Sequence, residues 1–196
     1  KVDIKDLLQA GAHFGHKSSR WHPKMAPYIH GKRDGAHIIN LEQTVSALDE
    51  ALPKITNYIK HGKQVLFVGT KKQMKQPVQE IAESVHMPYV TVRWVGGTLT
   101  NAGTINRQIK KLQDLERRMN SGELESRYSK LEVQRLQEEI DALNERYGGI
   151  KEMTEQPAAV IVADAIVDHN AIKEARTMGI PVFALCDTNV DPTTVD

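Results

Sequence analysis

Three histidines lie close together near the start of the chain, in the stretch GAHFGHKSSRWHPKM from Gly11 to Met25. His13 and His16 are three residues apart, which places both imidazoles on one face if the backbone there is helical. A structural zinc site usually needs four nitrogen or sulfur ligands, and the chain has a single cysteine, which is distant in sequence. A metal site would have to recruit further histidines or a distant aspartate. We therefore predict no bound metal and no cofactor.

Aspartates form a second candidate site, because they follow apolar runs that predict strands. Asp164, Asp168 and Asp187 come after two such runs, and carboxylates that converge at strand ends can hold Mg²⁺ or accept a phosphoryl group. However, Asp168 directly precedes a helical pattern and is typical of an N-cap, while Asp187 lies in the turn-rich stretch DTNVDPTT. We predict that the protein is not an enzyme. A metal-dependent α/β enzyme or phosphoacceptor that uses these acids is the alternative.

The histidine-rich stretch is also basic when it is extended to residue 33. Residues 11–33 contain five lysines and arginines and no acid, with Trp21, Tyr28 and four histidines interleaved. Cations neutralise phosphates and flat side chains stack on bases, so this composition favours contact with RNA. The segment lacks the apolar periodicity of a core element. Its predicted RNA-binding residues are His16, Lys17, Arg20, Trp21, His22, Lys24 and Arg33.

Four short apolar runs predict the strands that would position these residues. They are almost continuously apolar, as in the strands of a parallel sheet that is covered on both faces. Helical patterns join them in pairs, which predicts right-handed strand–helix–strand crossovers. The strand runs are residues 64–70, 88–94, 158–165 and 180–188, and the joining helices are 72–86 and 169–179.

A longer helical pattern precedes the first of these strands, at residues 41–62. Its apolar positions have helical spacing, but we expect Pro53 to kink the helix or to break it in two. Residues 37–41 predict a short strand or an entry segment.

Two loops at the carboxyl ends of the predicted strands have features of phosphate contacts. Gly69 and Thr70 lead into a helix N-terminus flanked by lysines, and the later stretch RWVGGTLTN combines a guanidinium, an indole and two glycines. Neither GxGxxG nor GxxxxGK[ST] is present, so the phosphate of a polymer is favoured over a free nucleotide. A tight turn with a half-buried Trp94 would also explain the second loop. The predicted RNA-binding residues are Lys71, Lys72, Arg93, Trp94, Gly96, Gly97, Thr98 and Asn101.

The region from residue 101 to 147 interrupts the alternation of strands and helices. Two apolar stripes at helical spacing flank the turn signal MNSGELES, which predicts an antiparallel coiled-coil hairpin. The first helix is basic and the second acidic, so cross-helix ion pairs explain most of these charges. We reserve RNA contact for the base of the first helix, at Arg107, Lys110 and Lys111. The predicted division is an α/β core of residues 1–100 and 148–196 with the inserted hairpin 101–147.

Bulk composition limits the class of protein. The formal charge is only +1, from 26 basic and 25 acidic residues, so any basic surface must come from the distribution of the charges. A single cysteine excludes a disulfide within the chain and suits a reducing compartment. Neither a 20-residue apolar run nor a signal peptide is visible, so we expect a soluble cytosolic protein without a membrane partner. The start at Lys1 and the abrupt end suggest a chain trimmed at both ends.

Several motifs together resemble a known family. HFGH, W.PKM..YI.G.R, HIINLE.T, FVGTKK, RWVGGTLTN, GGIKEM and IKEA...GIPVFA..DTN.DP occur in this order along essentially the whole chain. They resemble the second protein of the small ribosomal subunit, in its bacterial type.

This resemblance implies a flavodoxin-like parallel sheet with a protruding coiled-coil hairpin. It also implies a non-enzymatic role in the cytoplasmic ribosome: binding small-subunit rRNA near the junction of head and body, joining late in assembly, and helping to anchor the large mRNA-binding first protein of that subunit. The family motifs that carry RNA contacts are matched here by the segment from HFGH to PKM, the lysines after FVGT, and the loop RWVGGTLTN.

Overall fold

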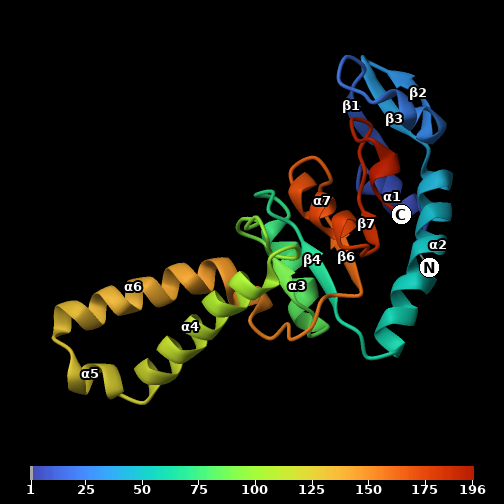
Figure 1. The fold of residues 1–196 in the computed structure, drawn as a ribbon. Helices are drawn as coiled ribbons and strands as arrows, with labels where there is room; N and C mark the ends of the chain where they lie inside the picture. Colours follow the sequence, from blue (N-terminus) through green and yellow to red (C-terminus); the bar gives the residue numbers. More distant parts are fainter. Residues whose placement is uncertain (1) are drawn as a thin grey trace.

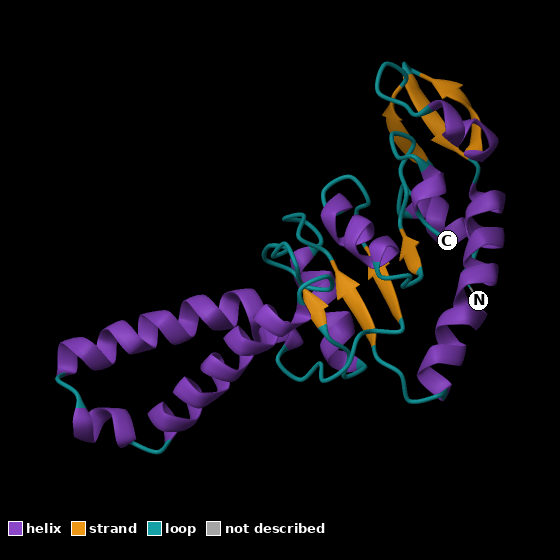
Figure 2. Ribbon diagram, in the orientation of Figure 1, coloured by secondary structure: helices purple, strands orange, loops and turns teal. Residues whose placement is uncertain are grey.

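A parallel sheet lies at the centre of the molecule in the computed structural model, which describes residues 2–196 (Figures 1 and 2). Within that range the sheet has four strands, in the order β5 (Tyr89–Val90), β4 (Val65–Val68), β6 (Ala159–Val162) and β7 (Val182–Ala184). All neighbouring pairs are parallel. In chain order this is 2-1-3-4, the beginning of the flavodoxin-like arrangement. The predicted parallel sheet flanked by helices is confirmed.

Both faces of this sheet are covered, which explains the continuously apolar strands. Leu66 and Val160 point into the main core, whereas Val65 and Ala159 pack with Phe183 on the opposite face. The strands are nevertheless shorter than the apolar runs. β5 lies at the edge of the sheet and pairs with β4 only through residues 89 and 90, because the chain beyond it turns away into the RWVGGTLTN loop.

Helix α2 (Leu41–Lys60) covers the second face and runs through Pro53 without ending. Of the two expected effects of Pro53, a kink or a break, the break is therefore wrong. Proline removes one intrahelical hydrogen bond, but Ala51 and Ile55 on either side of it both pack against the cluster around Val65 and Phe183. Tertiary packing thus holds the helix together across the proline.

Two further helices connect the strands. α3 (Lys75–Ser84) joins β4 to β5, and α7 (His169–Thr177) joins β6 to β7. These crossovers run in opposite directions along the sheet, so right-handed connections place the two helices on opposite faces. α7 contributes Ala171, Ile172 and Ala175 to the main core.

A helical hairpin projects from the edge of the sheet beside β5 (Figure 1). It consists of α4 (Ala102–Asn120), the short α5 (Glu123–Arg127) in place of a simple turn, and α6 (Lys130–Tyr147). A capping box of Ser129 and Glu132 starts α6. The apolar stripes meet in a core that is continuous with that of the sheet, and Lys111 pairs with Glu139 across the helices.

The chain returns to the sheet through the short 3-10 helix η2 (Gly148–Ile150). There Gly149 packs so closely that a methyl group on it would lie 2.3 Å from the carbonyl oxygen of Tyr89. Both ends of the hairpin are therefore rooted at the same edge strand.

The basic N-terminal segment folds into a second sheet, which we call the small sheet. Following helix α1 (Ile4–Gln9), its three strands within the described range are β1 (Phe14–Lys17), β2 (Ile29–Arg33) and β3 (Ala36–Ile39), antiparallel in the order β1-β3-β2. The 3-10 helix η1 (Pro23–Tyr28) joins β1 to β2 and buries Met25, which is 4% exposed. The expected strand near residues 37–41 is confirmed. Residues 11–33 also form the strands β1 and β2, which the sequence analysis did not predict, and neither strand has a fully buried residue.

A tight turn explains this small sheet. Asp34 and Gly35 both have positive φ, 50° and 80°, between the paired residues Arg33 and Ala36. A two-residue turn of this kind suits Asp-Gly and matches the twist of antiparallel strands. The Asp-Gly pair was visible in the sequence and could have predicted the hairpin.

Candidate nucleic-acid interface

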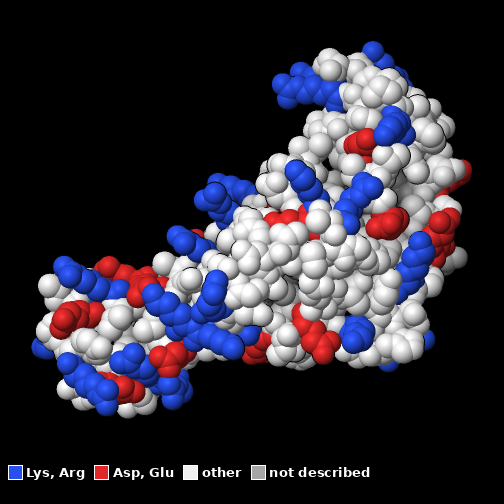
Figure 3. All heavy atoms as spheres, viewed as in Figure 1, with Lys and Arg blue, Asp and Glu red and all other residues white. Residues whose placement is uncertain are grey.

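Basic side chains gather in several places along one side of the molecule. The loops after β4, β5 and β6 lie on the side between the small sheet and the helical hairpin (Figure 1). Lysine and arginine atoms are visible at the tip of the small sheet, beside these loops and along the hairpin (Figure 3). Acidic atoms lie among them, so the partners of each cation decide which ones could meet a polyanion.

The loop from Trp94 to Thr100 is organised around a carboxylate of its own chain. Glu174, on α7, accepts hydrogen bonds at Oε1 from the indole N–H of Trp94 (3.0 Å) and the main-chain N–H of Gly97 (2.8 Å). Its Oε2 accepts from the main-chain N–H groups of Leu99 (3.0 Å) and Thr100 (3.3 Å) and from the Thr100 hydroxyl (3.2 Å). Gly97 makes this turn possible with φ of +91°.

The protonation of Glu174 follows from these contacts. Burial alone would raise the pKa of Glu174, but the hydrogen bonds from Trp94, Gly97, Leu99 and Thr100 together outweigh it and hold the pKa below its ordinary value. The carboxylate is therefore ionised at neutral pH, and the loop holds a fixed negative charge.

This geometry corrects two expectations about the loop. Trp94 is only 9% exposed and its N–H is used by Glu174, so the indole is not an open stacking plane. Thr98 is also buried and its hydroxyl donates to the carbonyl of Val95 at 2.6 Å. The alternative interpretation, a tight turn with a buried tryptophan, fits this part of the loop. Arg93, Gly96 and Asn101 are exposed.

The loop after β4 is likewise tied to acids that follow β6. Lys71 Nζ lies 2.6 Å from Asp164 Oδ2, and the hydrogen bond and charge of Asp164 raise the pKa of Lys71. Thr70 donates to Asp168 from its main-chain N–H (3.1 Å) and from its hydroxyl (2.6 Å). Asp168 occupies the N-cap position of α7, but its side chain makes no capping hydrogen bond, which corrects the capping expectation. Lys72 is exposed and makes no ion pair within residues 2–196.

The basic N-terminal segment is fastened to the turn after β7 by two aspartates. His16 Nδ1 lies 2.8 Å from Asp187 Oδ2, and Lys24 Nζ lies 2.8 Å from Asp191 Oδ2. His22 Nε2 is 3.9 Å from the Asp191 carboxylate. The segment contains no acid of its own, but the fold brings these acids to it from more than 160 positions away. We call these contacts the clasp.

The hydroxyl of Thr188 completes the clasp. It accepts the main-chain N–H of His16 at 2.9 Å, while the Thr188 carbonyl accepts the main-chain N–H of His22 at 2.8 Å. Gly15 lies so close that a methyl group there would be 2.5 Å from Thr188 Cγ2. The turn after β7 and the strand β1 are thus in intimate contact.

The remaining cations of the small sheet face outward. Lys17, Arg20 and Lys32 are exposed, and none of them pairs with a carboxylate in the described part of the chain. Arg33 lies 3.7 Å from the carboxylate of its neighbour Asp34, and both side chains are almost fully exposed. Trp21 is 40% exposed, with its ring tilted against that of His37 at 5.1 Å.

The base of the hairpin has a mixed pattern. Arg107 donates to the hydroxyl of Thr104 at 3.0 Å, and Lys110 is exposed with no ion pair among residues 2–196. Lys111 forms an ion pair with Glu139. The expected cross-helix pairing therefore includes one of the three residues reserved for RNA.

The aspartates of the alternative enzyme hypothesis have structural partners. Asp164 also accepts the main-chain N–H groups of Ile166 and Val167, each at 3.0 Å, in addition to Lys71. Asp187 accepts from the main-chain N–H of Thr188 at 2.6 Å besides contacting His16. Across residues 2–196, no group of three or more histidine, cysteine, aspartate or glutamate side chains is arranged to hold a metal ion.

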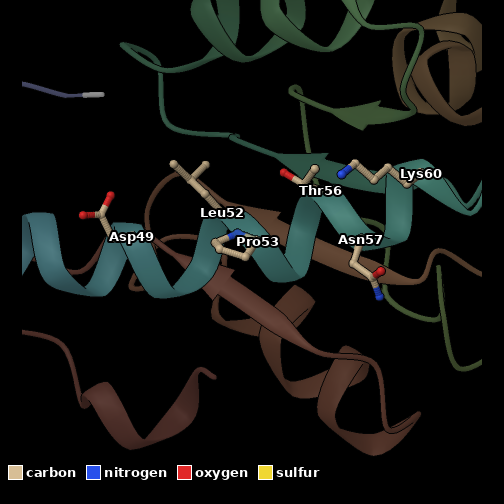
Figure 4. A pocket seen from close by; sticks show the side chains of 6 residues that line it. All are labelled: Asp49, Leu52, Pro53, Thr56, Asn57 and Lys60. Atoms are coloured by element: carbon tan, nitrogen blue, oxygen red, sulfur yellow. The ribbon is translucent and has the colours of Figure 1, made fainter.

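Surface hollows lie elsewhere. One of about 430 Å³ is lined entirely by the outer face of α2, from Asp49 to Lys60 (Figure 4). Another of about 680 Å³ lies between α7 and the 3-10 helix η3 (Pro192–Thr194), with Ile166, Lys173 and Arg176 in its lining. Neither includes a residue that the sequence predicted to bind RNA.

Sequence reasoning overlooked Glu174 and did not connect the acids that follow β6 and β7 with the basic residues of these loops. Glu174, Asp164 and Asp191 each serve donors at least 74 positions away. Local spacing carries no signal for such pairs. Lys32 contributed to the charge count but was not predicted to be a contact, although its position next to Arg33 would have justified including it.

Comparisons with known proteins agree on one family. The family model described as Ribosomal protein S2 matches residues 7–196. Proteins named small ribosomal subunit protein uS2 are similar over the whole chain. That of Cytophaga hutchinsonii is 46% identical over 196 residues, which are 77% of its length, and that of Chloroflexus aggregans is 45% identical over 195 residues, 82% of its length. That of Mycobacteroides abscessus is 44% identical over 195 residues, 70% of its length.

Among residues 2–196, no helix is both long enough and apolar enough to cross a membrane.

Proposed function

Because the chain belongs to the ribosomal protein S2 family, we propose that it binds small-subunit rRNA through the outward-facing cations of the small sheet, of the loops after β4 and β5, and of the hairpin base. The family consists of structural proteins of the small ribosomal subunit that take part in translation and not of enzymes, and it resides with the ribosome in the cytoplasm. The chain is a member of that subunit, together with its rRNA and its other proteins. The contacts to rRNA are the proposal.

One observation carries the proposal: the acids of the chain neutralise some of the basic residues on this side and leave others free for an external anion. The clasp uses His16 and Lys24, and Asp164 uses Lys71. The remaining exposed residues form the proposed primary contact set, which within the described chain comprises Lys17, Arg20, Trp21, Lys32, Arg33, Lys72, Arg93, Gly96, Asn101, Arg107 and Lys110.

These residues suit the RNA backbone better than base edges. Exposed lysines and arginines contact phosphates and fix orientation, whereas sequence is read by groups that reach the bases. Trp21, with 40% of its surface exposed, is the side chain in this set that can stack on a base or a ribose. His16, His22, Lys24, Lys71 and Lys111 remain in the proposal as secondary contacts, because RNA would have to compete with their carboxylate partners or share them.

A salt titration of rRNA binding tests the proposal. We compare the unaltered chain with Lys17→Ala, Arg20→Ala and Arg93→Ala, using fluorescence anisotropy with small-subunit rRNA. Affinity falls as salt rises, so a plot of log affinity against log salt has a negative slope. Each lost phosphate contact should make this slope less steep by about 0.7 to 0.9.

The control is Lys54→Ala, an exposed lysine of α2. Loss of affinity in the three variants with little change in the control supports the proposed surface. Equal effects in all four variants, or unchanged slopes in all of them, would refute it.

We further propose the partners and the stage of assembly that the family resemblance implies. The chain joins the small subunit late and helps to hold the large mRNA-binding first protein. The test is quantitative mass spectrometry of small subunits from cells depleted of this chain. Loss of the first protein, with early-binding proteins at normal levels, is the expected result, and full retention of the first protein would contradict it.

We also propose that the hairpin of residues 101–147 is a separate structural unit inserted into an α/β core of residues 1–100 and 148–196. Its base shares the core of the sheet through Ile105 and Ile109, so a test must keep that base. Replacing residues 113–139 by a short glycine-rich linker should leave the sheet folded, as judged by circular dichroism and cooperative unfolding. Loss of the cooperative transition would contradict the division.

A further inference from the structure

The contacts of Glu174 make up an anion site that is filled by the chain itself. The donors are the main-chain N–H groups of Gly97, Leu99 and Thr100, with the Trp94 indole and the Thr100 hydroxyl added to them. The N–H of Thr98, between them, donates to the carbonyl of Val95 instead. Neighbouring main-chain N–H groups that converge on one anion form a nest, which in many proteins binds phosphate. Here the occupant is a carboxylate from α7.

The chemistry of the nest requires a carboxylate at this position. Oε1 and Oε2 both accept hydrogen bonds, from two separate sets of donors. An ionised carboxylate has acceptors only, whereas the amide of glutamine would turn an NH₂ group toward one of these sets. Replacing the carboxylate by an amide would therefore leave buried N–H groups facing another donor.

Several of the proposed contact residues lie directly beside the filled nest. Arg93 directly precedes Trp94, and Gly96 is the exposed residue next to Gly97. On the other side, the main-chain N–H of Asn101 donates to the carbonyl of Gly97 at 2.8 Å, and α4 begins at Ala102. The start of the helix that carries Arg107 and Lys110 is thus built on the same turn.

We propose that Glu174 is a positioning residue for rRNA binding: its carboxylate fills the nest of residues 97–100 and holds Arg93 and the first turns of α4 in the orientation that meets the RNA. The inference rests on the proposed function. In this arrangement the RNA backbone passes along the outside of the loop, over Arg93 and Gly96, and does not enter the nest.

The test uses the full chain with Glu174→Gln, Glu174→Ala and Arg93→Gln, and the double variant of Glu174→Gln with Arg93→Gln. Affinity for small-subunit rRNA is measured by fluorescence anisotropy, and folding is checked by circular dichroism. Glu174→Gln should weaken binding about tenfold, as expected when a cation loses its register on the phosphates. Because Glu174 acts through Arg93, the double variant should bind little worse than Glu174→Gln alone.

Chemical rescue separates positioning from a general loss of stability. Formate or acetate can enter the space that Glu174→Ala vacates and accept the same N–H groups. At constant ionic strength, formate should restore much of the rRNA affinity of Glu174→Ala, with chloride as the matched salt. Failure of rescue in a variant that remains folded would overturn the inference. If Glu174→Ala does not fold, the double-variant comparison with Glu174→Gln decides alone.

The remaining outcomes are distinguishable. If Arg93→Gln weakens binding and Glu174→Gln does not, positioning by Glu174 is wrong although the loop binds RNA. If neither variant affects binding, the proposed contact at this loop fails as well. Tighter binding by Glu174→Ala would show that a phosphate normally displaces Glu174 from the nest, which also overturns the inference. Glu145→Gln, on the exposed face of α6, controls for the change in net charge.

Discussion

The loop of residues 94–100 and the clasp on the small sheet use carboxylates of the chain in different ways. In the loop, one partly buried acid accepts hydrogen bonds from several donors of one turn, and the cation beside it, Arg93, stays exposed. In the clasp, more exposed acids pair directly with individual basic residues, His16 and Lys24. Glu174 therefore shapes the loop and leaves Arg93 available to an external anion. The aspartates of the clasp position Lys24 but also offset its positive charge.

This difference has energetic consequences. Hydrogen bonds to a desolvated carboxylate are costly to leave unmade, because the donors then remain buried without a partner. Ion pairs on the surface contribute little and are screened by salt. We therefore expect the loop to depend strongly on its acid and the clasp to depend more on close packing than on charge.

The largest effect is expected for Glu174→Ala. Removing the carboxylate leaves the N–H groups of Gly97, Leu99 and the Trp94 indole without their acceptor, which should lower the free energy of unfolding by about 3 kcal/mol. Urea denaturation followed by circular dichroism measures this change. Glu145→Ala on α6 is the control, and a loss no larger than in that control would remove the distinction between the two regions.

The next effect tests packing in the clasp. In Gly15→Ala the new methyl group would lie 2.5 Å from Thr188 Cγ2 and 3.1 Å from the carbonyl oxygen of His37. Overpacking of this kind should cost about 2 kcal/mol. Gly31→Ala in β2 is a matched control, since apart from residues 30–32 no heavy atom of the described chain lies within 4 Å of its new methyl group. Similar thermal stabilities for the two variants would mean that β1 and the turn can separate easily.

A smaller effect of opposite sign is expected for Asp168→Asn. Burial raises the pKa of Asp168, with Asp164 acting in the same direction and the hydrogen bonds from Thr70 only partly opposing it. The folded carboxyl therefore binds its proton more tightly than the unfolded one, whose pKa is about 3.9. Ionisation consequently lowers stability as the pH rises through this range, and the loss persists at neutral pH.

Asparagine can still accept the main-chain N–H of Thr70 and donate to its hydroxyl. Asp168→Asn should therefore equal or exceed the stability of the unaltered chain at pH 7, by less than about 1 kcal/mol. The difference should shrink toward pH 4 in thermal unfolding experiments. A clear destabilisation at pH 7 would show that this loop, like the nest, needs a charged acid.

The smallest effect concerns the exposed end of the clasp. The hydrogen bonds from Lys24 and Thr193 hold the pKa of Asp191 well below its ordinary value, so the group stays charged through the neutral range and any stabilisation it supplies is lost only in acid. Asp191→Asn frees Lys24 and should tighten rRNA binding about twofold at low salt, with no such gain at high salt. Weaker binding would indicate that the pair positions Lys24 for the RNA.

Local patterns predicted most of the fold. Runs such as residues 64–70 and the spacing of Ile105, Ile109 and Leu112 depend on burial of a single element, so they identified the parallel sheet and the hairpin. The small sheet was missed because its strands have only four or five residues and depend on pairing with β3. The tendency of Pro53 to break the helix was overestimated, since packing on both sides of it holds the helix together.

The candidate site was less predictable, because its organisation depends on partners far apart in sequence. The basic character of residues 11–33 was evident, but the acids that contact His16 and pair with Lys24 come from the turn after β7. The loop RWVGGTLTN was recognised as an anion-binding shape, and its occupant Glu174 lies 77 positions beyond Gly97. The residue types showed that these segments could bind an anion, whereas only the fold showed which carboxylate of the chain each segment contacts.

The rooting of the hairpin at one edge strand has a consequence for how its length can change. The chain leaves after β5, and it comes back at Gly149 against Tyr89 of the same strand. Equal numbers of residues can therefore be added to or removed from α4 and α6 without altering the register of any other strand. Seven residues on each helix would shift the tip by about 10 Å. The length of the hairpin can therefore change in evolution independently of the sheet that supports it.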